Sequence, residues 1–265
     1  MASMGQKTQS LLNRLAAVTS GTTAILANYL DEGGDIDAAH GDFTLLSKAV
    51  EVSQPTVVRW LLERNANPNS NHPLGSAAYS GDLALATLLL DAGAHLDAPD
   101  ERGHVPLQRA TDADAISMVR LLVDAGANPN AGAPGGYLPL LVCRSVGVLS
   151  ILIEAGANVN AYTSDGDTAL MLAAHAGHLD MARVLVESGA DVNARGLGDT
   201  PFATSALAYA VDEDHEDIVR LLVGAGVDLQ AENDHYYNAT LEPLHQLASN
   251  PTIASLVRSP EPSGT

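Results

Sequence analysis

The chain has 265 residues, of which 46% are hydrophobic and 17% are charged, so it can build a core and differs in composition from disordered chains. Its 32 acidic residues outnumber its 13 basic residues, which gives a net charge of −19. Because this charge repels phosphate backbones and anionic lipid head groups, we expect neither nucleic acid nor a membrane surface as a partner.

The first predicted element is an N-terminal cap over about residues 10–37. Residues 11–33 show the apolar spacing of two short helices with Gly21 between them, but Asn13 and Arg14 stand where later units have apolar residues. Terminal units of a repeat array differ in this way because one of their faces meets water. The segment therefore predicts one end of a stack of similar units.

A phrase of apolar residues, Gly-Ala and an Asn or Asp pair recurs through the internal repeats, about residues 38–230. It reads Leu-Leu-Val-Asp-Ala-Gly-Ala-Asn-Pro-Asn at 121–130 and Leu-Val-Glu-Ser-Gly-Ala-Asp-Val-Asn at 185–193. Apolar residues at helical spacing that run into glycine predict a helix end, because glycine adopts the left-handed conformation at low cost. The matched positions are Gly33, Asn65, Gly93, Gly126, Gly156, Gly189 and Gly226.

A predicted helix start comes before the helix end in each internal unit, and in five units it lies 20 residues earlier. Proline suits the first helical position because it lacks an N–H, and a Thr or Ser just before the helix can cap it. Each unit then holds two short helices joined at a break such as Gly177. In the sixth unit we favour the frame at Ser205-Ala206 over Thr200-Pro201. The predicted starts are Leu45, Pro73, Pro106, Pro139, Ala169 and Ala206.

The last predicted element is a C-terminal cap over about residues 231–258. A helix start at Pro243 is followed by a second helix from Pro251, which lacks the closing Gly-Ala. Residues 259–265 are rich in Pro, Ser and Gly and predict a flexible tail. These elements together predict a single repeat domain over residues 1–258.

The repeated pattern resembles the ankyrin repeat, whose units recur at about 33 residues and open on Thr-Pro-Leu-His-x-Ala. Residues 166–193 are similar to the family pattern, and the resemblance covers about residues 10–258. It implies an all-α solenoid of about eight helical hairpins, caps included, with β-hairpin-like finger loops. Because the family binds partner proteins through its finger loops and first helices, the resemblance also implies a non-catalytic protein-binding module.

No residue pattern for catalysis or metal binding stands out, and we expect no catalytic residue, no metal and no cofactor. His175 and His178 could share a helical face, but they straddle Gly177 and lack a third ligand nearby. The sequence contains no Gly-x-Ser-x-Gly motif, P-loop or dinucleotide fingerprint. The alternatives are an enzyme or enzyme-accessory protein with a site among the enlarged fingers 194–204 and 230–242, and a purely structural or assembly role.

Aromatic residues make up 4% of the chain, and most fall in or beside the predicted fingers. Aromatic side chains anchor protein interfaces, although some can instead pack beneath their own loops. Carboxylates alternate with them and would attract a basic partner, with inhibition or neutralisation of that partner as one specific role. The predicted partner-binding residues are Phe43, Tyr137, Tyr162, Phe202, Tyr236, Tyr237, Asp100, Glu101, Asp165, Asp167, Glu232 and Asp234.

The sequence also bears on where the chain works. Its first thirty residues lack a signal-peptide pattern, and no stretch approaches the roughly 20 apolar residues that span a bilayer. Its single cysteine excludes an internal disulfide bond. We therefore expect a cytoplasmic protein that is monomeric on its own, and its alanine-rich, lysine-poor composition suggests a bacterial origin.

Overall fold

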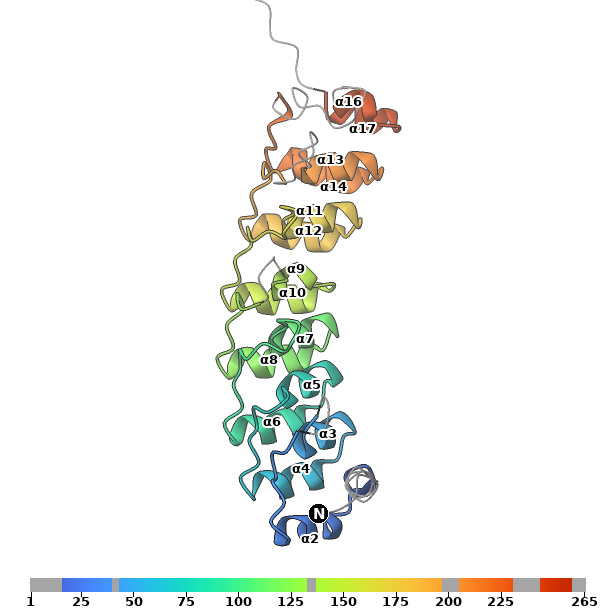
Figure 1. Cartoon of the computed structure of the whole chain (residues 1–265). Coiled ribbons are helices and arrows are strands. Elements are labelled where there is room, and N and C mark those ends of the chain that lie inside the picture. Colours follow the sequence, from blue (N-terminus) through green and yellow to red (C-terminus); the bar gives the residue numbers. More distant parts are fainter. Residues whose placement is uncertain (1–15, 40–42, 133–136, 197–204, 231–243, 259–265) are drawn as a thin grey trace, which may run out of the picture. The chain divides into compact units, whose positions relative to one another are not determined.

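The structure is a computed structural model that describes residues 16–39, 43–132, 137–196, 205–230 and 244–258 (Figure 1). It divides into two compact units, Met1–Ala133 and Pro134–Thr265. All the named secondary-structure elements among the described residues are helices, so the predicted all-α repeat fold is confirmed. None of the described helices is long and apolar enough to cross a membrane.

In the first unit, short helices pack in pairs, and each pair stacks on the next. The first helices α3, α5 and α7 form one layer, and their partners α4, α6 and α8 form the other. Residues 16–20 are also helical, and Gly21 follows them with a φ of 72° at the break that the sequence predicts. The helices are α2 (Ala24–Asp31), α3 (Leu45–Glu51), α4 (Pro55–Leu62), α5 (Pro73–Ser80), α6 (Leu83–Asp91), α7 (Pro106–Asp112) and α8 (Ile116–Asp124).

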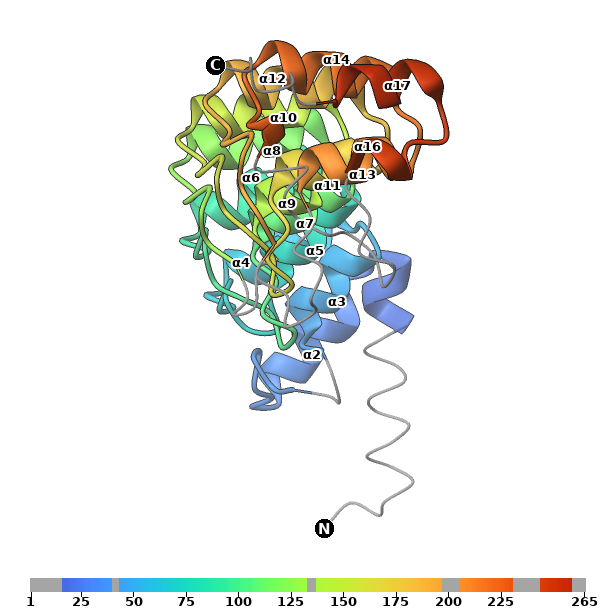
Figure 2. The ribbon, with the colours of Figure 1, turned by 90° about the horizontal axis from the view of Figure 1, so that it is seen from above.

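The second unit repeats this two-layer arrangement. Figure 2 shows α12, α14 and α17 in one row and α11, α13 and α16 in another, in agreement with their packing contacts. The first helix of its first pair, α9, is short, because only 17 residues separate Pro139 from Gly156 where five other units have 20. The helices are α9 (Pro139–Val142), α10 (Val146–Glu154), α11 (Ala169–His175), α12 (Leu179–Glu187), α13 (Ala206–Asp212), α14 (Glu216–Gly224), α16 (Leu244–Leu247) and α17 (Pro251–Leu256).

The six predicted helix starts are confirmed, because α3, α5, α7, α9, α11 and α13 begin at those residues. Thr44 and Ser47 form a reciprocal cap on α3: the Ser47 N–H donates to Thr44 Oγ1 at 3.2 Å, and the Thr44 N–H donates to Ser47 Oγ at 2.8 Å. Ser205 Oγ accepts the Ala208 N–H at 3.1 Å, so the favoured frame of the sixth unit is correct. The predicted helix-end glycines all have positive φ, and Asn65 takes the same conformation with φ 63°.

The core of each unit lies between its layers and consists mainly of leucine, valine and alanine. Leu45, Leu61 and Leu107 in the first unit and Leu170 in the second are at most 1% exposed. Paired alanines in the first helices, such as Ala173-Ala174 of α11, are buried as well, and their small size lets neighbouring first helices approach closely.

Successive repeats within each unit are joined by side-chain to backbone hydrogen bonds along the loops. Asp97 Oδ1 accepts the Asn128 N–H at 3.0 Å, and Asn160 Oδ1 accepts the Asp191 N–H at 2.8 Å. The same bond recurs from Asp37 to Asn67, from Asn69 to His95 and from Asn193 to Asp228. The recurring Asn or Asp pair therefore has two roles: its first member accepts an N–H within its own loop, as Asp191 does from Asn193, and its second member accepts an N–H from the next repeat, as Asn193 does from Asp228.

Asn160 also donates from Nδ2 to the Gly189 carbonyl at 3.3 Å. We expect Asn160→Ala to lower the free energy of unfolding by about 1–2 kcal/mol, because it removes this bond and the bond from the Asp191 N–H. Asn160→Asp keeps the acceptor and loses only the donor, so it should cost less. Urea denaturation followed by circular dichroism measures both variants. Equal stability of the two variants would show that the Asp191 N–H does not need this acceptor.

Four architectural predictions stay predictions. The tail at residues 259–265 lies outside the described residues, and so does the start of the N-terminal cap at residues 10–15. The β-hairpin-like form of the fingers is represented by two isolated antiparallel bridges, Tyr162 with Thr168 and Arg195 with Ser205. The fourth is the prediction that residues 1–258 form a single domain.

Candidate functional site

Two of the predicted aromatic anchors are well exposed. Tyr137 is 58% exposed two residues before α9, and Tyr162 is 56% exposed seven residues before α11, where it forms a bridge with Thr168 across a finger loop. Phe43, before α3, is half-buried, and Lys48 Nζ lies 5.6 Å from the centre of its ring. The predicted residues Phe202, Tyr236, Tyr237, Glu232 and Asp234 lie outside the described residues.

The predicted carboxylates divide into exposed and engaged groups. Glu101 and Asp165 are exposed at finger tips, where a partner could reach them. Asp167 is half-buried and accepts the hydroxyl of Tyr209 at 3.3 Å. Asp100 is only 13% exposed in its side chain and makes several internal contacts, so its main contribution is to the structure of its own finger.

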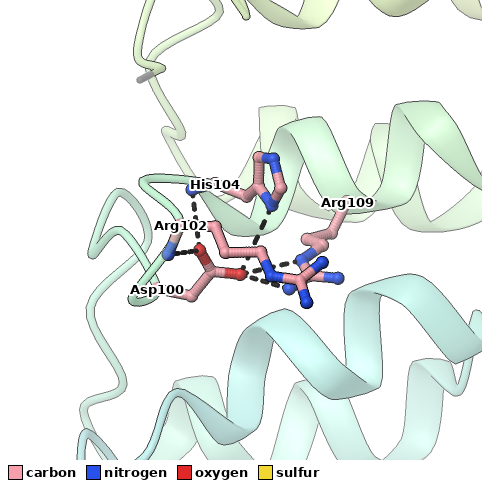
Figure 3. Close-up of polar contacts among 4 residues, drawn as sticks. All are labelled: Asp100, Arg102, His104 and Arg109. Atoms are coloured by element: carbon pink, nitrogen blue, oxygen red, sulfur yellow. Dashed lines mark hydrogen bonds and ion pairs between the residues drawn. The ribbon is translucent and has the colours of Figure 1, made fainter. Parts of the chain in front are cut away.

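Asp100 organises the finger turn at residues 100–104 (Figure 3). Its Oδ1 accepts the backbone N–H of Arg102 and of His104, each at 2.9 Å, while its own N–H donates to the His104 carbonyl. Thr163 does the same at 163–167, where its Oγ1 accepts the N–H of Asp165 at 3.3 Å and of Asp167 at 3.2 Å. Asp100 and Thr163 therefore hold equivalent positions in two fingers.

Asp100 also holds the side chain of Arg109 from α7. Arg109 Nε donates to Asp100 Oδ2 at 3.1 Å and Arg109 Nη2 donates to the same oxygen, while His104 Nδ1 lies 3.6 Å from it. Burial acts to raise the pKa of Asp100, but the hydrogen bonds from Arg109, His104 and Arg102 and the charge of Arg109 outweigh it. The pKa therefore lies below the ordinary value of 3.8, and the carboxylate is charged at neutral pH.

A cavity of about 180 Å³ opens beside this finger. One wall comes from the finger near residues 69–72, which is shortened because Asn65 and Gly93 are only 28 residues apart, and from the first turn of α5. The other wall comes from the 100–104 turn and α7. This cavity was not predicted from the sequence, although the 28-residue spacing and the glycine at position 75 are visible there. Its lining residues are Asn71, His72, Gly75, Ser76, Asp100, Glu101, Arg102 and Arg109.

The candidate chemistry elsewhere is limited. Among the described residues, no group of three or more His, Cys, Asp or Glu side chains is placed to hold a metal ion. His175 Nε2 lies 3.4 Å from Glu213 Oε1, but both side chains are about half exposed, as expected for a solvated surface pair. The alternative site among fingers 194–204 and 230–242 falls mostly on residues outside the described part of the chain.

Comparison with known proteins places this geometry in context. The family model for ankyrin repeats (three copies) matches residues 46–133 and 138–233. A protein of Rickettsia bellii (strain RML369-C) that is named as an ankyrin repeat protein is 35% identical over 98 residues, which cover 32% of this chain and 28% of that protein. Glycerophosphocholine phosphodiesterase GDE1 of Candida albicans (strain SC5314 / ATCC MYA-2876) is 32% identical over 108 residues, which cover 36% of this chain and 9% of that enzyme. The matched part thus spans less than a third of either relative.

Proposed function

The chain belongs to the ankyrin repeat family, and from this premise we propose that it binds a basic protein through the acidic, aromatic-bearing side of its finger loops. Ankyrin repeats are protein-interaction scaffolds and are generally non-catalytic. The phosphodiesterase relative shares only a small part of its length with this chain, so its activity does not transfer.

The observation that carries the proposal is the exposure of Tyr137 and Tyr162 on an acidic chain. A tyrosine at an interface buries a large area at a small entropic cost, which makes exposed tyrosines strong candidates for anchors. Exposed carboxylates at the fingers, among them Glu101 and Asp165, add a negative field that speeds encounter with a basic partner. Within this proposal, the chain acts as a cytoplasmic monomer that inhibits or neutralises its partner.

The test begins with affinity capture at low and high salt, followed by purification of the captured protein and titration against defined variants. We expect a basic partner whose affinity falls steeply with salt, because exposed charge pairs are screened. The double variant Tyr137→Ala with Tyr162→Ala should weaken binding at least about tenfold, the loss typical of interface anchors.

Tyr79→Ala is the matched control, because Tyr79 is 55% exposed on α5 and lies outside the predicted set. It should leave the affinity unchanged, and circular dichroism should show that all variants keep their helices. A captured partner that is acidic, or one that binds the double variant as tightly as the parent, would rule the proposal out.

A further inference from the structure

The cavity beside the 100–104 turn exists because of a glycine. Gly75 is the third residue of α5, and the matched residues of the neighbouring first helices, Ser47 in α3 and Gln108 in α7, carry buried side chains. A Cβ built on Gly75 would meet no atom within 4 Å, so the space is open at this residue. Glycine inside a helix costs about 1 kcal/mol relative to alanine, and the local packing offers no reason for this cost.

The polar groups of the cavity that remain available to a ligand are mainly donors. Both oxygens of Asp100 already accept hydrogen bonds, as described above. The guanidinium group of Arg102 makes no ion pair or hydrogen bond among the described residues, and Arg109 uses only Nε and Nη2 for Asp100. Figure 3 shows the Arg102 side chain extending from the 100–104 turn toward the side chain of Arg109, which comes from α7.

A buried polar atom also lacks a partner in this wall. His72 Nδ1 is inaccessible to solvent and makes no hydrogen bond within the described part of the chain. A buried polar group without a partner costs about 1–3 kcal/mol, and an occupant of the cavity could remove this cost only if the His72 ring turned toward it. The Ser76 hydroxyl and the Asn71 amide add two further groups that can donate to an acceptor.

We propose that this cavity binds one carboxylate group, carried by an acidic side chain or the C-terminus of a bound polypeptide, between Arg102 and Arg109. A volume of about 180 Å³ suits a single side chain, whereas drug-sized ligands need roughly 300–1,000 Å³. A guanidinium group matches a planar carboxylate with paired hydrogen bonds. The exposed Glu101 carboxylate also lines the cavity and opposes the anion, so it limits the affinity.

The site does not depend on the proposed basic partner, because it is assayed with peptides alone. The probes are acetylated, amidated Gly-Glu-Gly for a side-chain carboxylate, acetylated Gly-Gln-Gly with a free C-terminus for a terminal carboxylate, and acetylated, amidated Gly-Gln-Gly as the neutral control. In NMR titrations of the full chain, we expect at least one carboxylate peptide to shift the Arg102 and Arg109 Nε–H signals with a Kd of about 1–10 mM. The neutral peptide should not shift these signals.

Four variants make the assay specific. Arg102→Gln should weaken binding at least about tenfold, as expected for loss of a charged hydrogen-bond donor. Gly75→Gln should abolish binding by filling the cavity, yet it should fold at least as stably as the parent because glutamine favours a helix more than glycine does. Glu101→Gln should tighten binding, and Arg120→Gln, at an exposed position of α8, should change nothing.

The proposal is overturned if the neutral peptide binds as well as both carboxylate peptides, or if Gly75→Gln binds unchanged. Inorganic phosphate that shifts the same signals at equal or lower concentration would also contradict it, because the site would then be a general anion site. Failure to find a basic partner leaves these outcomes unaffected.

Discussion

Replacing Leu170 by alanine is expected to lower the free energy of unfolding by about 3–5 kcal/mol, the cost of a leucine truncation that leaves a cavity in a packed core. Leu170 is 0% exposed in α11, which packs against α12 and α13, so little space is available for the neighbours to collapse into. Urea denaturation followed by circular dichroism measures the change. Leu172→Ala in the same helix is the control, and it should cost less because Leu172 is only half-buried.

The same variant tests the proposal that residues 1–258 form a single cooperative domain. Trp60, the only tryptophan of the chain, lies in α4 of the first unit, whereas Leu170 lies in the second. If the two units unfold together, Leu170→Ala should shift the Trp60 fluorescence transition and the circular dichroism transition by the same amount. A Trp60 transition that stays at the parent's urea concentration would mean two independent domains.

Asp100→Ala is expected to be the next most damaging change, at about 2–3 kcal/mol, because it removes several hydrogen bonds at once and leaves the Arg109 guanidinium without its partner. Thermal and urea unfolding measure the loss. Asp100→Thr is the matched variant, since Thr163 supports the equivalent turn. It should keep the backbone turn and lose only the pairing with Arg109, so its free energy of unfolding should lie between those of the parent and Asp100→Ala.

A comparison of the parent with Asp100→Thr also measures how far the stability of this finger depends on pH through Asp100. Because the pKa of Asp100 is lowered by folding, its stabilisation is present above the unfolded pKa and is lost as the pH falls through the folded pKa. Between neutral pH and about pH 3, the parent should therefore lose more stability than Asp100→Thr. Parallel pH profiles of the two proteins would show that Asp100 does not contribute through its charge.

The helix boundaries could be predicted from the sequence because each depends on a local signal. A first-turn proline or a capping hydroxyl marks the starts at Pro106 and Ala169, and a left-handed residue such as Gly189 or Asn65 marks the ends. These signals act within a few residues of chain, so periodicity and residue type are sufficient to read them.

The contacts between repeats could not be read in the same way, because each joins residues about thirty positions apart that stacking brings together. The sequence shows the Asn or Asp pair at 191–193, but only the structure shows that Asn193 holds the Asp228 N–H. Asp100 is a similar case: its acidic character predicted a partner-binding residue, while its geometry makes it a support for the finger and for Arg109.

The cavity was harder still to foresee. The glycine at position 75 is visible in the sequence, but its openness depends on how the shortened finger folds. Asn71 and His72 both adopt positive φ there, at 60° and 52°, which non-glycine residues seldom do and which short-range patterns do not specify.

The hydrogen bonds between the loops have a consequence for how such a chain can change over generations. A typical repeat presents the same acceptor to its successor and the same N–H to its predecessor, as residues 191 and 193 do. A gene segment encoding one whole repeat could therefore be duplicated or deleted, and the new neighbours would find compatible joints on both sides. The number of repeats can therefore change without new contacts at the junctions, and the exposed loop tips can diverge independently.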